Sequence, residues 1–356
     1  MSNKEHEENL LKEFASSTNG GSTENVYMDA GQEERKPVTD LGKVRIQTPG
    51  KISQEELDAD PNIKKMQNLI NYVPLAMEEL PTQGRFYAQN ARIYIRAARV
   101  GEVREYSMMD EANPADVIDK MNYILSSCSK IMFGNLQGSY KDIMDHDRFY
   151  VLLKISELTF VNGETNIQIP IPSGSCKTPG CKHQKTTKLT TGMLERPDPD
   201  ELLEKYYDEE GRCYSIRTKQ YGTIQIAPPT IGVTSEVREW AVSRTQSSKE
   251  WDQSIAQMIP FFRREWRNFS DKEILAMATE FEGWDIGKYT LVYRMIEKLN
   301  ASVGMSPNIH IKCESCGGDM VVPVMFQSES DNGNELRGGF KALFVQNISD
   351  RLDELL

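Results

Sequence analysis

The sequence predicts an α+β fold in which two short β-hairpins carrying cysteine pairs flank a mainly helical insertion. Residues Asn308 to Phe326 place a Cys-x-x-Cys-Gly turn between two apolar runs. Residues Gln168 to Thr190 place Cys176 and Cys181 on either side of a Lys-Thr-Pro-Gly turn, again between apolar or β-branched runs. Most of the chain between these segments has the apolar spacing of helices. We therefore expect a zinc-ribbon-like pair of hairpins, a small β-element and several helices.

The two cysteine pairs predict one shared metal site. Thiolates two residues apart on a tight turn can both point at a tetrahedral ion, but one such turn supplies only two ligands. We expect Cys176, Cys181, Cys313 and Cys316 to close a single structural zinc site that joins segments about 130 residues apart.

Other interpretations of these cysteines remain open. They can be ordinary buried thiols, and Cys313 with Cys316 can be a redox pair. The redox motif normally opens a helix, whereas Gly317, Gly318 and the Val-Val-Pro-Val run disfavour one here. His183 and His310 lie beside the cysteines in sequence and are alternative ligands.

Composition narrows the class of protein. The chain has 356 residues, of which 38% are hydrophobic, so it can bury a normal core. Its net charge of −11 argues against nucleic acid as the main partner, because nucleic-acid binders usually carry a basic stripe. No apolar run reaches the roughly 18 residues that span a bilayer, and six cysteines with four in pairs fit a reducing compartment. We expect a soluble protein made in a cytosol.

Shifts in composition divide the chain into six parts. These are an acidic disordered tail (1–65), an N-terminal α+β domain (66–165), the first zinc hairpin (166–195), a mainly helical insertion (196–305), the second zinc hairpin (306–327), and a polar loop with a C-terminal amphipathic helix (328–356).

Local signals in the N-terminal domain predict a turn over Leu80 to Tyr87 and a strand over Arg92 to Arg99. Asn113 and Pro114 begin a predicted helix that runs to about Ile131. A second helix is predicted from Met144 to Leu158. Its first residues, Asp145, His146 and Asp147, resemble catalytic groups, but acids at a helix start are expected from capping and the macrodipole, and we interpret them so.

The insertion has clear start and stop signals. A short helix is predicted from Asp200, strands over Tyr214 to Gln225, and a helix from Thr234 that Pro260 interrupts. Ser270 and Glu273 form a capping box for a helix ending near Gly283, and another helix is expected from Ile286 to Val303. The aromatic residues are interpreted as core, not as a nucleobase platform: Trp251, Phe261, Phe262, Trp266 and Trp284.

The chain lacks the common catalytic signatures. It has no Ser-His-Asp spacing, phosphate-binding glycine loop or His-Glu-x-x-His helix. A zinc ion held by four thiolates has no open position for a substrate, so we expect a protein that is not an enzyme and that gains folding energy from the metal. A metalloenzyme with a mixed Cys/His site is the alternative.

The order of these elements resembles the baseplate hub and hub-assembly proteins of T-even-like contractile-tailed phages. Three places carry the likeness: the turn LPTQGRFY from Leu80, the Asn113-Pro-Ala-Asp-Val-Ile helix leading into DHDRFYVLLKISELTF from Asp145, and the cysteine hairpin behind it. Cys313-Glu-Ser-Cys-Gly is a further point of likeness. The long N-terminal tail and the helical insertion depart from the family pattern.

The resemblance implies a non-enzymatic assembly factor or structural subunit of the phage baseplate hub, located in the host cytoplasm and possibly in the virion. Its implied partners are other tail and baseplate hub proteins, with no nucleic acid, membrane or small-molecule substrate. For the metal, only the four cysteines named above carry over. A zinc-ribbon adaptor for nucleic acid or a polymerase is the alternative function.

Overall fold

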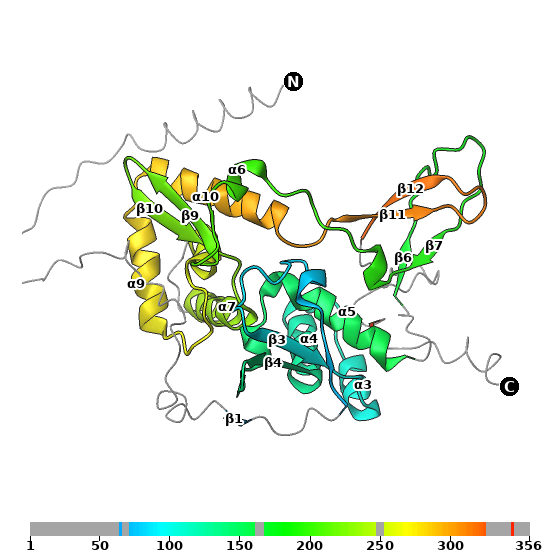
Figure 1. Cartoon of the computed structure of the whole chain (residues 1–356), viewed down its shortest axis with the longest axis horizontal. Coiled ribbons are helices and arrows are strands. Elements are labelled where there is room, and N and C mark those ends of the chain that lie inside the picture. The colour runs from blue at the N-terminus through cyan, green and yellow to red at the C-terminus, as the bar shows by residue number, and fades with distance from the viewer. Residues whose placement is uncertain (1–63, 66–70, 161–166, 247–252, 325–342, 345–356) are drawn as a thin grey trace, which may run out of the picture. The chain divides into compact units, whose positions relative to one another are not determined.

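A computed structural model describes residues 64–65, 71–160, 167–246, 253–324 and 343–344 (Figure 1). These residues form eight α-helices and four small antiparallel sheets, which confirms the mixed α+β class. The predicted tail (1–65) lies outside the described residues except for Lys64–Lys65, and the predicted C-terminal helix lies outside them except for Leu343 and Phe344.

The N-terminal domain is built on a five-stranded sheet in the order β1-β5-β4-β3-β2. Ile93 pairs with Ile131 at its centre, and both side chains are fully buried. The central strands have apolar side chains on the face that packs against the helices. The elements are β1 (Lys64–Lys65), β2 (Val73–Pro74), β3 (Ala91–Ile95), α3 (Val100–Ser107), α4 (Pro114–Cys128), β4 (Ser129–Phe133), β5 (Leu136–Gln137) and α5 (Arg148–Thr159).

The start of α4 follows the prediction, but its end does not. The Asn113 side chain accepts a hydrogen bond from the Ala115 amide, with Pro114 at the first position of the helix. The helix ends at Cys128, and the chain enters β4 at once, so the predicted end at Ile131 is wrong. The apolar residues after Cys128 fit both helical and strand spacing, and pairing with β3 decides in favour of the strand.

The predicted strand over Arg92 to Arg99 is also too long. It ends at Ile95, and Val100–Ser107 forms a helix that the sequence pattern did not indicate. Glu102 stabilises the start of this helix, because its carboxylate accepts a hydrogen bond from the Arg99 amide at 2.7 Å. The same carboxylate forms a two-pronged ion pair with Arg96, which lowers the pKa of Glu102 to about 2.

The predicted turn at Leu80 to Tyr87 is present and has an unexpected anchor. Gln83 and Gly84 have positive φ values of 55° and 70°. The buried Asp147 carboxylate accepts hydrogen bonds from the Thr82 amide (2.9 Å), the Thr82 hydroxyl (2.7 Å) and the Tyr87 hydroxyl (2.7 Å). The turn is therefore held to the start of α5 by one carboxylate.

This geometry corrects the capping interpretation of the Asp-His-Asp sequence. Asp147 occupies the N-cap position of α5, yet its side chain makes no capping hydrogen bond. Asp145 instead forms an ion pair with Arg148 at 2.7 Å, and His146 Nε2 lies 3.0 Å from Asn300 Oδ1. Burial raises the pKa of Asp147 to about 6.

The insertion combines five helices with a three-stranded sheet of order β10-β9-β8. The predicted capping box at Ser270 is confirmed. The predicted short helix after Asp200 is present as well, and the Asp200 side chain caps it. The interruption at Pro260 is confirmed as well, since a 3-10 turn over Ile259–Phe262 follows the preceding helix. The elements are α6 (Glu201–Glu204), β8 (Tyr207–Asp208), β9 (Cys213–Thr218), β10 (Gly222–Ile226), α7 (Ile231–Gln246), α8 (Gln253–Met258), α9 (Asp271–Glu282) and α10 (Ile286–Ser302).

The insertion packs directly on the N-terminal domain. The Ile231 amide donates to the Ile143 carbonyl, and the Asp145 amide donates to the Pro229 carbonyl, both at 2.8 Å. Arg85 also forms a two-pronged ion pair with Glu204, at 2.9 and 2.8 Å. The insertion is thus attached by backbone pairing and charge as well as by the two hairpins that flank it.

The aromatic residues of the insertion pack as core, as predicted. The rings of Phe262, Phe281 and Trp284 lie 4.2 to 5.9 Å apart between centroids, and Phe261 is buried. The Lys141 ammonium lies over the Trp266 ring, with Nζ 4.4 Å from the ring centroid. Trp251 lies outside the described residues.

Gly232, near the start of α7, leaves no room for a side chain. A Cβ atom at this position would lie 2.2 Å from the Trp266 ring, so the indole or the helix must shift. We expect Gly232→Ala to destabilise the fold by about 1 to 3 kcal/mol. Denaturant unfolding of the purified variant measures this loss.

Gly101 in α3 provides the matched control, because a Cβ there would meet nothing within 4 Å. Gly101→Ala is expected to be neutral or to stabilise by up to about 1 kcal/mol, since alanine is the better helix former. Equal effects of the two substitutions would contradict the packing argument.

Candidate metal centre

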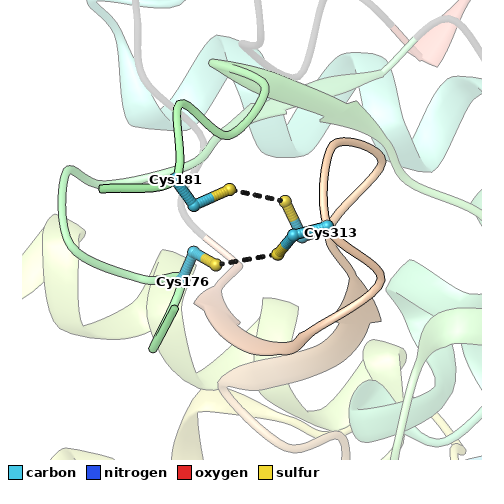
Figure 2. A group of neighbouring side chains, drawn as sticks. Cys176, Cys181 and Cys313 are labelled. Carbon is cyan, nitrogen blue, oxygen red and sulfur yellow. Dashed lines mark hydrogen bonds between the residues drawn. The ribbon is translucent and has the colours of Figure 1, made fainter. Parts of the chain in front are cut away.

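Four cysteine sulfurs converge where the two hairpins meet (Figure 2). The first hairpin consists of β6 (Gln168–Pro170) and β7 (Thr186–Lys188), and the second of β11 (Asn308–Lys312) and β12 (Asp319–Pro323). Cys176 Sγ lies 3.5 Å from Cys316 Sγ, and Cys181 Sγ lies 3.6 Å from Cys313 Sγ. All four sulfurs lie within 4.8 Å of one another. Four soft donors at this spacing could hold a metal ion.

Glycines shape the second turn around the sulfurs. Gly317 has a φ of 71°, which a residue with a side chain rarely adopts, and its amide donates to the Cys313 carbonyl at 2.8 Å. A Cβ on Gly318 would lie 3.3 Å from Cys316 Sγ and 3.9 Å from Cys176 Sγ. The turn therefore needs glycine at position 317 for its backbone angle, and at position 318 a side chain would be in tight contact with the sulfurs.

The two hairpins are joined by more than their cysteines. Cys176 forms an isolated antiparallel bridge with Met320 of the second hairpin. The Glu314 amide donates to Gln184 Oε1 at 3.1 Å, and the Ser315 hydroxyl donates to the Lys182 carbonyl at 2.9 Å. Each turn thus holds the other in place, and the four sulfurs are arranged by these contacts.

The surroundings favour a thiolate at Cys316. The Thr178 hydroxyl, 3.4 Å from Cys316 Sγ, and the Gly318 amide lower the pKa of this thiol to about 6, because both stabilise the charged sulfur. Hydrogen bonding to Cys316 and the other thiols raises the pKa of Cys181 to about 12. Four thiols this close do not all ionise without a cation among them.

Both candidate histidines lie outside the sulfur cluster. His183 Nε2 lies 3.2 Å from the Pro172 carbonyl oxygen, and His310 Nδ1 lies 2.7 Å from a Glu195 carboxylate oxygen. The metal-ligand group found among the described residues contains the four cysteines alone. Cys128 and Cys213 are buried elsewhere, and burial raises the pKa of both thiols.

Sequence reasoning missed the residues that support the cysteines. Thr178, Gln184 and Ser315 contact the sulfurs or the turns that carry them. Thr178, two positions after Cys176, is the only one of them that the sequence could have suggested as a partner of a sulfur. Small polar residues are common in turns of every kind, so this signal is weak.

The cysteine hairpins are anchored to the rest of the chain at their base. The Thr191 amide and hydroxyl donate to the Glu157 carboxylate of α5 at 2.7 and 2.8 Å. The Ser306 amide donates to the Glu195 carbonyl at 2.7 Å, which pairs the two chain segments that enter and leave the hairpins. The four-cysteine cluster is therefore built on residues from both sides of the insertion.

A cavity of about 330 Å³ lies beside this base. Its lining includes the ion-pairing groups Glu79 and Lys154, which lie 3.8 Å apart, together with Thr191 and Arg196. No cysteine lines it, so the sulfur cluster and the cavity are separate features.

Comparison of the chain with family models, curated proteins and solved structures finds no match in any of the three. Among the described residues, no helix has the length and apolar character that crossing a membrane requires.

Proposed function

We propose that the chain is a zinc-stapled protein-binding subunit or assembly factor of a phage tail baseplate hub. The convergence of Cys176, Cys181, Cys313 and Cys316 is the observation that carries the first part of this proposal. A tetrahedral zinc ion with zinc–sulfur bonds of about 2.3 Å separates its sulfurs by about 3.8 Å. The observed separations of 3.5 and 3.6 Å, and a set of four thiols without a histidine, fit that geometry.

A zinc ion with four protein ligands serves the fold and not a reaction. All four positions are filled by cysteine, so none is left for water or substrate. The ion would supply folding free energy by tying the first hairpin to the second across the insertion. This supports a non-enzymatic role in which the protein acts through its surfaces.

The hub assignment rests on the resemblance in the order of elements. The Leu80 to Tyr87 turn, the helix that Asn113 caps, the helix beginning at Arg148 and the first cysteine hairpin occur in that order along the chain. In the structure the turn and the start of the second helix share the Asp147 carboxylate. Two of the segments that carry the likeness are thus in direct contact, which is consistent with a common role.

The test is complex formation with the tail and baseplate hub proteins of the phage that encodes the chain. We expect the zinc-loaded chain to co-elute with at least one hub protein after co-expression, as measured by size-exclusion chromatography with mass spectrometry. A folded, zinc-loaded chain that binds none of them would overturn the hub assignment.

A further inference from the structure

The first cysteine hairpin differs in charge from the rest of the chain. Residues 167–194 contain no aspartate or glutamate, although 53 of the 356 residues of the chain are acidic and the net charge is −11. Four lysines lie in this stretch, and all four are exposed: Lys177, Lys182, Lys185 and Lys188. The hairpin is therefore a basic surface on an acidic protein.

Three of these lysines have no carboxylate partner among the described residues. Within the part of the chain that the structure describes, Lys177, Lys182 and Lys185 form no ion pair with a carboxylate. Some lysines elsewhere do pair with carboxylates: Lys120 pairs with Glu105 and Lys298 with Asp200, each at 2.5 Å. The ammonium groups of these lysines concentrate positive charge on the first hairpin, where they outnumber the carboxylates of the second hairpin packed against it, Glu314 and Asp319.

Neither protection of strand edges nor balancing of a zinc–thiolate cluster accounts for all of the positive charge on the first hairpin. Lysines on edge strands can prevent unwanted strand pairing, but Lys177, Lys182 and Lys185 lie outside β6 and β7. A zinc ion with four thiolates carries a formal charge of about −2, which two lysines are enough to balance. Lys177, Lys182 and Lys185 alone number three, so positive charge remains for another molecule.

We propose that this lysine-rich hairpin is the docking surface for an acidic segment of a partner protein. The inference rests on the proposed function, because it names the surface through which an assembly protein would recognise its partner. Residues 167–194 contain neither arginine nor an aromatic residue, the groups that provide bidentate phosphate contacts and base stacking in nucleic-acid sites.

The test uses the full zinc-loaded chain and a fluorescein-labelled poly-glutamate peptide as the probe. The hairpin variant replaces three lysines with glutamine: Lys177, Lys182 and Lys185. The control variant makes the same charge change at three exposed lysines of the insertion: Lys205, Lys219 and Lys272. Fluorescence anisotropy measures binding of the peptide, and of a labelled DNA duplex, at about 50 and about 300 mM salt.

We expect the wild type and the control variant to bind poly-glutamate in low salt, and the hairpin variant to bind it at least about tenfold more weakly with its zinc retained. Equal weakening in both variants, or no binding by the wild type, would overturn the proposal. Tighter binding of the DNA duplex than of the peptide would overturn it in favour of nucleic acid. A failure here leaves the hub assignment standing, because complex formation with hub proteins tests that assignment separately.

Discussion

Replacing Cys316 with serine is expected to abolish zinc binding and to separate the two hairpins. The substitution removes one of four sulfurs that lie within 4.8 Å of one another, and a hydroxyl is a poor zinc ligand. Apparent zinc binding free energies in small structural sites are on the order of 10 kcal/mol, so its loss exceeds any single packing defect. Native mass spectrometry should find one zinc in the wild type and none in Cys316→Ser, with a lower unfolding temperature.

Cys128→Ala is the matched control, because Cys128 is also a free thiol but lies buried in the N-terminal core. It should lower stability through lost packing and leave the zinc content unchanged. Removal of the metal from the wild type with a chelator should reproduce the Cys316→Ser result. A wild type that contains no metal and is indifferent to the chelator would overturn the zinc proposal.

Replacing Asp147 with alanine is expected to cost about 3 to 5 kcal/mol of unfolding free energy. The buried carboxylate accepts three hydrogen bonds, from the Thr82 amide, the Thr82 hydroxyl and the Tyr87 hydroxyl, and alanine leaves all three donors without that partner. Thr82→Val removes only one donor and should cost about 1 to 2 kcal/mol. Denaturant unfolding of the two variants tests this order.

The pH dependence of the Asp147 effect has a definite sign. Burial raises the pKa of Asp147 to about 6, above that of an exposed aspartate, so the folded state binds the proton more tightly than the unfolded state. The stability contribution of this group is present in full below the unfolded pKa and is lost as pH rises through about 6. The difference between the wild type and Asp147→Ala should therefore be larger at about pH 4.5 than at about pH 7.5. The opposite order would contradict burial as the dominant cause.

Features with a local cause were predictable from the sequence. Asn113 with Pro114, and Ser270 with Glu273, begin helices because their side chains satisfy amides only a few residues away. The cysteine turns belong to the same class. Spacing and glycine placement mark each of them as a turn with two sulfurs, and the structure places all four sulfurs together.

Features that depend on distant residues were not predictable in the same way. The residues from Ser129 to Ile131 fit a helix by local spacing, and only the backbone of β3, about 40 residues earlier, makes them a strand. The helix Val100–Ser107 depends on the Glu102 carboxylate, which accepts from the Arg99 amide and pairs with Arg96, and neither contact gives an apolar pattern in the sequence.

Asp147 shows most clearly what the sequence could not predict. At the start of a helix its sequence context is that of an ordinary capping acid, and the sequence by itself determined no more than that. Its three partners lie on a turn about 60 residues away, so tertiary packing alone decided that it is buried and binds that turn. The sequence by itself determined the fold class, the caps at Asn113 and Ser270, and the two cysteine turns. Tertiary structure decided strand pairing, the attachment of the insertion and the buried carboxylate, because each of these depends on contacts between distant segments.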